Sequence, residues 1–220
     1  MTPCPTTIPP PRRASTLVRR LPAPRVPALL ALAAALLLPA CSPLSGSARG
    51  YEARSIADGS TLSPRFPTAI YRAEDENSAY LYLTDLSPAD LRPGAPVDTL
   101  TGHIVRVHNF VRPRAGRTPI ETTAFTASVT HAVFAQGQIG IYRGGGFFEP
   151  DRAPGGTRFG GTLNGGSLRI ERATPGFVDR LGSATLQAQF QVRRDDASSA
   201  LIQARLEELI RAAQPVDPDR

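Results

Sequence analysis

The sequence predicts a mainly β domain, an antiparallel β-sandwich or open barrel of about seven to nine strands with one C-terminal α-helix. Apolar and polar residues alternate from Ser183 to Arg193, which is typical of a strand with one buried face. Nine of the 23 residues from Gly144 to Gly166 are glycine, which excludes a helix there. From Asp195 to Ala213 the apolar period changes to 3.6 and predicts the single helix.

The first predicted strands form a hairpin. Residues 69–71 and 79–83 flank the polar turn 74–78. Alternation along the second strand places Tyr80 and Tyr82 on one face, opposite Ala79, Leu81 and Leu83. Beyond the hairpin, Ser87–Leu91 has the composition of a capped helical turn, with Ser87 and Asp90 as a capping box.

Further strands are predicted over Gly102–Arg112, over Ile120–Ala135 as one bent strand or two, and around 139–142. Asn164-Gly165 lies between two short alternating runs and favours a two-residue hairpin turn. Val178–Leu181 is expected to add a helical turn before the strand that starts near Ser183.

An apolar run from Val26 to Ala40 follows five arginines and contains no charge. Fifteen helical residues span only about 22 Å, which is short of a bilayer core of about 30 Å, so the run indicates an export leader. Leu38-Pro39-Ala40-Cys41 resembles the lipobox of bacterial lipoproteins, although Pro39 departs from the usual small or hydroxyl residue. The resemblance implies cleavage before Cys41 and lipid on its thiol. A plain secretory leader or an uncleaved anchor is the alternative.

The leader and the patterns that follow it together predict a domain organisation for the whole chain. Residues 1–40 are the signal peptide, 41–67 the lipidated cysteine with a flexible tether, 68–213 the β domain and 214–220 a disordered tail. The membrane is then a partner through the N-terminal lipid. By similarity to lipoprotein sorting, Ser42 after the cysteine favours the periplasmic face of the outer membrane.

Charge and composition exclude several classes of function. Five of the 25 basic residues, all of them arginine, precede Cys41, which leaves 20 against 19 acidic residues and gives no support to a nucleic-acid partner. The absence of lysine excludes Schiff-base and phosphate-loop chemistry. Cys41 is the only cysteine after the leader, so no internal disulfide can form. We expect no cofactor.

No catalytic residues are predicted, and no metal site. His103 and His108 lie five residues apart on a strand and therefore face opposite sides. Strand geometry would permit a metal site formed by His103, His131 and a carboxylate such as Asp85. The simpler interpretation is that these histidines are exposed or hydrogen-bonded strand residues.

Four aromatic residues are the predicted contacts for a ligand or partner. Tyr80 and Tyr82 could stack on sugar rings, and Phe147 and Phe148 could form the tip of a Gly-rich loop, unless the tyrosines only pair across strands. The sequence thus favours a non-enzymatic binding or structural module of the cell envelope, with an envelope protein or glycan as partner. The alternative is an exported hydrolase or metal-dependent enzyme that uses the strand histidines and a carboxylate.

Overall fold

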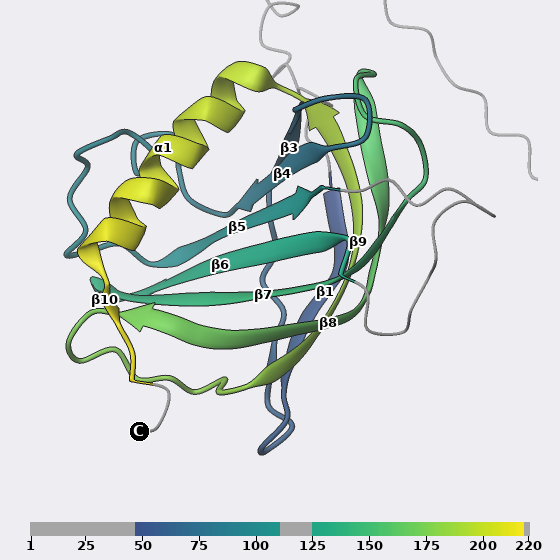
Figure 1. Cartoon of the computed structure of the whole chain (residues 1–220). Helices are drawn as coiled ribbons and strands as arrows, with labels where there is room; N and C mark the ends of the chain where they lie inside the picture. Colours follow the sequence, from purple (N-terminus) through teal and green to yellow (C-terminus); the bar gives the residue numbers. More distant parts are fainter. Residues whose placement is uncertain (1–46, 111–124, 218–220) are drawn as a thin grey trace, which may run out of the picture. The chain divides into compact units, whose positions relative to one another are not determined.

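The computed structural model of the chain describes residues 47–110 and 125–217. It confirms the predicted class, a mainly β fold with one C-terminal helix (Figure 1). The elements in chain order are β1 (Ser47–Ser55), β2 (Thr61–Leu62), β3 (Thr68–Ala73), β4 (Ala79–Thr84), β5 (Gly102–Asn109), β6 (Ala127–Ala135), β7 (Gln138–Pro150), β8 (Arg158–Ala173), β9 (Ala184–Arg194), α1 (Asp196–Ala212) and β10 (Gln214–Pro215).

Seven consecutive strands, β3 to β9, form a closed barrel. Each strand pairs antiparallel with the next one in the chain, from the β3–β4 pair to the β8–β9 pair. Because the number of strands is odd, the first and last run in the same direction, and the barrel closes through a parallel β3–β9 pairing. This seam is short and joins Ile70 to Arg193 and Tyr71 to Arg194.

β1 occupies the rest of the same edge of β9. Ser47 pairs with Gln191 and Ser55 with Ala184, and β2 then pairs antiparallel with β1. Tyr51 and Ala53 point into the core. The predicted flexible tether is therefore wrong from Ser47 onward, because the backbone of this segment completes the sheet edge that the short seam leaves open.

Two hydrophobic clusters lie on opposite faces of the sheet, because side chains alternate along each strand. The larger cluster fills the barrel with residues from β1 and from all seven barrel strands. The smaller one lies outside, between the strands β3 to β7 and α1, which crosses their outer face in Figure 1. The helix contributes Ile202, Leu206 and Leu209 to it, and its C-cap contributes Ala213, which together follow the apolar stripe that the sequence predicts.

The start of α1 and its attachment have clear local causes. Asp195 is the N-cap, and its carboxylate accepts a hydrogen bond from the Ser198 backbone N–H at 2.9 Å. Arg205 is fully buried; its guanidinium forms an ion pair with Glu208 and donates to the carbonyl oxygen of Ala95. These contacts fix the segment between β4 and β5 against the helix.

The Gly-rich region differs from the prediction. Asn164 and Gly165 do not form a hairpin turn but lie inside the 16-residue strand β8, at a β-bulge where the pairing to both neighbours shifts. Gly165 has a φ of +57°, which the bulge requires. Glycines around it let β7 and β8 approach closely: a Cβ on Gly144 would lie 1.7 Å from the carbonyl oxygen of Ser167. The glycine content indicated a close approach of the backbone in this region, but it did not distinguish a hairpin turn from a β-bulge.

The described residues form one compact unit that holds both hydrophobic clusters. Among the described residues no helix has both the length and the apolar character needed to cross a membrane. The apolar run 26–40 and Cys41 lie outside the described residues.

Candidate ligand-binding site

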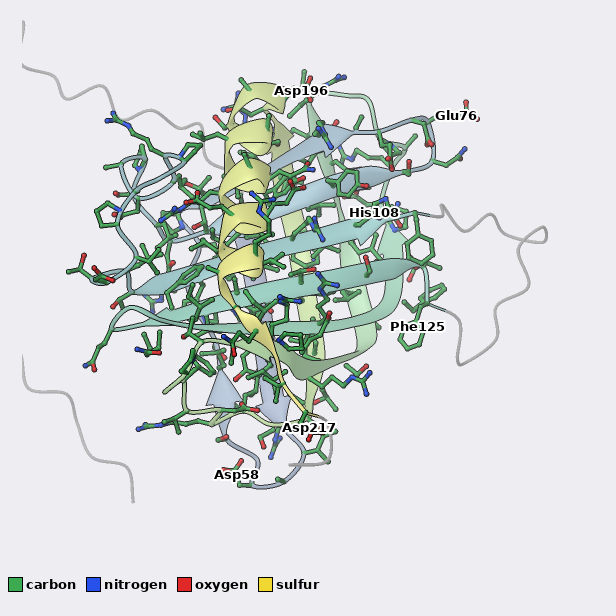
Figure 2. All side chains as sticks on the ribbon, turned by 60° about the vertical axis from the view of Figure 1, so that its left-hand side comes forward. Asp58, Glu76, His108, Phe125, Asp196 and Asp217 are labelled. Carbon is green, nitrogen blue, oxygen red and sulfur yellow. The ribbon has the colours of Figure 1, made fainter. Side chains whose placement is uncertain are left out.

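One end of the barrel opens into a pocket of about 780 Å³. Three connections surround it: the β1–β2 hairpin, the β6–β7 turn and the segment between β8 and β9. Figure 2 shows Asp58, at the turn after β1, at the opposite end of the molecule from Glu76 in the β3–β4 turn. The lining side chains are those of Ser60, Thr61, Leu62, Thr101, Val133, Ala135, Gln136, Gln138, Tyr142, Phe177, Val178, Arg180 and Leu181.

The β6–β7 turn and the start of the β8–β9 segment are joined by hydrogen bonds. Gln136 and Gly137 both have positive φ, 52° and 78°, as a tight two-residue hairpin needs. The Thr174 hydroxyl accepts from the Ile139 N–H and donates to the side-chain oxygen of Gln138, both at 2.9 Å. These bonds hold one side of the rim.

Asp179 shapes the rest of the β8–β9 segment. Its Oδ1 accepts hydrogen bonds from the Tyr142 hydroxyl at 2.6 Å and from the backbone N–H groups of Leu181 and Gly182. Burial, followed by the Asp179 carboxylate, raises the pKa of Tyr142, so this phenol stays protonated and donates. The predicted helical turn over 178–181 is absent, because Asp179 binds its own backbone instead.

Phe177 packs into the mouth of the barrel. Its ring lies against β7 at Gly140, where an added Cβ would be only 2.2 Å from the ring. It also meets the Tyr142 ring edge-to-face at a centroid distance of 6.5 Å. The apolar depth of the pocket thus depends on a glycine opposite an aromatic side chain.

Two of the three histidines lie inside the barrel, on the inward faces of β5 and β6. His131 is fully buried, and its two ring nitrogens contact the Tyr51 hydroxyl at 2.8 Å and His103 Nδ1 at 3.1 Å. A neutral imidazole donates from one nitrogen and accepts at the other, which suits this position. Burial lowers the pKa of His131 well below its usual value, and the neighbouring His103 lowers it further.

Of the four residues in the enzyme alternative, the structure brings the rings of His103 and His131 together but not that of His108. Asp85 contacts His103 through the backbone N–H, at 2.6 Å, rather than through the ring. His108 lies on the opposite face of β5, as the five-residue offset predicts, and contacts Glu74 at 3.0 Å. Within residues 47–110 and 125–217 no three histidine, cysteine or acidic side chains are grouped closely enough to hold a metal ion.

The predicted aromatic contacts are mostly covered. Tyr82 is fully buried under α1 and donates to the Gln203 side chain at 2.7 Å, and burial raises its pKa to about 12. Phe148 is fully buried in the barrel core because it lies in β7, not in a loop, and Phe147 precedes it in the same strand. The predicted positions, a solvent-exposed strand face for Tyr82 and a loop for Phe148, are therefore wrong.

Tyr80 is only partly buried but has neighbours on both adjacent strands. Its ring stacks on His108 at 4.0 Å, and the Arg72 guanidinium lies 5.2 Å from the ring centre. Arg72, Tyr80 and His108 are cross-strand partners on β3, β4 and β5. This arrangement matches the simpler interpretation, in which the tyrosine pairs across strands.

The mouth pocket was not anticipated from the sequence. Its lining comes from positions as distant as Leu62, Val133 and Leu181, and only the closure of the barrel brings them together. Comparisons of the chain with family models, curated proteins and solved structures return no match to any of them. The pocket is thus the feature of the structure that bears most directly on function.

Proposed function

We propose that this protein is a ligand-binding barrel of the cell envelope that holds a small apolar molecule in its mouth pocket. The observation that carries the proposal is the 780 Å³ pocket with a mainly apolar floor. Pockets of about 300–1,000 Å³, with apolar walls and a few polar groups, are the usual form of small-molecule sites, and barrel mouths are a common place for them.

The depth of the pocket favours an apolar ligand. Tyr142 and Leu181 are buried, and Leu62, Val133 and Phe177 are half-buried. The hydroxyl and amide side chains of the lining lie nearer the surface. A ligand that enters therefore removes apolar protein surface from water and leaves the polar groups of the rim solvated.

The proposed anchor is compatible with this site. By the lipobox resemblance Cys41 carries lipid, and the described chain begins at Ser47, where β1 pairs with Gln191. The pocket residues Ser60–Leu62 follow the other end of β1. With about 3.3 Å per strand residue, the two ends of β1 are roughly 25 Å apart, so the pocket lies at the end of β1 away from Ser47.

The test is saturable binding of a neutral apolar fluorophore, N-phenylnaphthylamine, to residues 42–220. We expect one probe per protein and a dissociation constant in the micromolar range or tighter. Val133→Phe adds bulk inside the pocket and should abolish binding. Leu201→Phe adds bulk on the exposed side of α1 and should leave binding unchanged. Absence of saturation in the wild-type protein, or equal binding by the Val133→Phe variant, would contradict the proposal.

A further inference from the structure

We infer that the ligand of the mouth pocket is an anionic amphiphile whose apolar chain enters the barrel and whose head group binds Arg180. The inference rests on the proposed function and specifies its ligand. Among the described residues that line the pocket, Arg180 is the only charged one; the other polar side chains there are the neutral hydroxyls and amides of Ser60, Thr61, Thr101, Gln136 and Gln138, with the phenol of Tyr142 below them.

The charge lies at the right depth for a head group. Arg180 is exposed, whereas the neighbouring Leu181 is buried and belongs to the core cluster of the barrel. The polarity of the site therefore changes from apolar at the floor to cationic at the rim. An amphiphile has the same gradient along its length, and its head group can remain in contact with water while its chain is buried.

The guanidinium of Arg180 is available for a ligand. It makes no hydrogen bond or ion pair with any other described residue, although its own backbone is held. The carbonyl oxygen of Arg180 accepts from the Ser60 hydroxyl at 3.5 Å, and Asp179 binds the backbone N–H groups of the two residues that follow Arg180. A guanidinium carried on such a segment can form charge-assisted hydrogen bonds to a carboxylate.

Two acidic residues close in sequence to the lining, Asp179 and Asp58, accept hydrogen bonds from other groups. Asp179 uses Oδ1 for the Tyr142 hydroxyl and for the two N–H groups of its own segment. Asp58, at the tip of the β1–β2 turn in Figure 2, accepts from the Ser60 N–H and is not part of the lining. Of the described residues that line the pocket, Arg180 carries a positive charge and none carries a negative one, which favours an anion over a cation of the same shape.

The test compares dodecanoate with dodecanol, both below their aggregation concentrations, by competition against the bound neutral fluorophore. At low ionic strength the wild-type domain should bind dodecanoate about tenfold more tightly, a difference of about 1.4 kcal/mol. Arg180→Gln should remove this preference without weakening dodecanol binding, and Arg180→Lys should keep part of it. Arg211→Gln, an exposed arginine of α1, is the matched control and should keep all of it.

The outcomes separate the inference from the proposed function. Equal binding of the two compounds by the wild-type domain, with the fluorophore still bound, would overturn the anionic ligand while the binding pocket stands. A preference that persists in Arg180→Gln would overturn the role of Arg180. Failure of the fluorophore and both compounds to bind would overturn the pocket and the inference together.

Discussion

Gly140 and Phe177 show how a single position defines the site. Gly140 has an ordinary backbone conformation, since it is not among the residues of positive φ, so its importance is steric alone. The Phe177 ring occupies the space that any larger side chain at 140 would need. The residue thus acts through a close approach of ring and backbone, not through a turn.

We therefore expect Gly140→Ala to displace Phe177 from the barrel mouth. Overpacking of this kind costs about 1–3 kcal/mol of unfolding free energy, and the variant should also lose fluorophore binding because the floor of the pocket changes. Urea denaturation and probe titration measure the two effects. Gly156→Ala, whose added methyl would meet only a carbonyl oxygen at 3.7 Å, should change neither. A stable Gly140→Ala variant with unaltered binding would refute this packing argument.

The buried histidines predict how stability depends on pH. Burial lowers the pKa of both His131 and His103, the latter against the raising effect of Asp85, so the folded protein binds fewer protons than the unfolded chain below about pH 6.5. Stability is then fully present above pH 6.5 and falls as the pH decreases. Each histidine contributes a slope of up to about 1.4 kcal/mol per pH unit.

Denaturation curves between pH 7.5 and 5.5 measure this slope. His131→Gln removes one titrating group and should give a shallower fall than the wild-type protein, whatever its absolute stability. Identical slopes for the two proteins would show that His131 titrates alike in the folded and unfolded states, contrary to its burial between Tyr51 and His103.

Sequence patterns predicted the faces of single residues better than their contacts. The offset between His103 and His108 correctly placed the two rings on opposite faces of one strand. The contact between His103 and His131 depends on the register of β5 against β6, where Val105 is the partner of His131. Nothing in the sequence near either histidine determines that register, so no pattern could have predicted the pair.

At the scale of elements, α1 follows directly from its sequence. The 3.6-residue period, the Asp195 cap and Arg211 in the last turn are all local signals, and the observed bounds differ from the predicted ones by one residue at each end. Strand β9 could be predicted equally well from the sequence, because buried and exposed residues alternate along almost all of it. The surface that α1 covers could not be predicted. Alternation places Tyr82 on the solvent-exposed face of its strand, but a helix from the other end of the chain packs over it.

Two leucines of α1 allow a matched test of how much the packing of the helix contributes to the unfolding free energy. Leu206 is fully buried against the outer face of the sheet, whereas Leu201 is 37% exposed. Leu206→Ala should lower the unfolding free energy by about 2–5 kcal/mol, since it leaves a cavity. Leu201→Ala should change it by about 0.5 kcal/mol or less. Urea denaturation of the two variants checks this, and equal costs would mean that the helix does not dock as described.

At the scale of the whole molecule, the proposed anchor and the barrel are separable. We expect Cys41→Ala to abolish the incorporation of labelled palmitate into the full-length protein, because the residue that would carry the acyl chains is removed. The unmodified chain is the control. A Cys41→Ala protein that still takes up the label would contradict lipidation at this residue.

The pairing of β1 with β9 governs when the protein can fold. Ser47 and Ser55, at the start of the described chain, take their partners Gln191 and Ala184 from the last barrel strand, so this contact is among the most distant in sequence. Distant pairings form late, since a long loop must close first. A chain still being synthesised lacks the strand that completes both the barrel and the edge beside it. We expect it to stay unfolded until β9 is made, which is the condition in which a polypeptide can be threaded across a membrane.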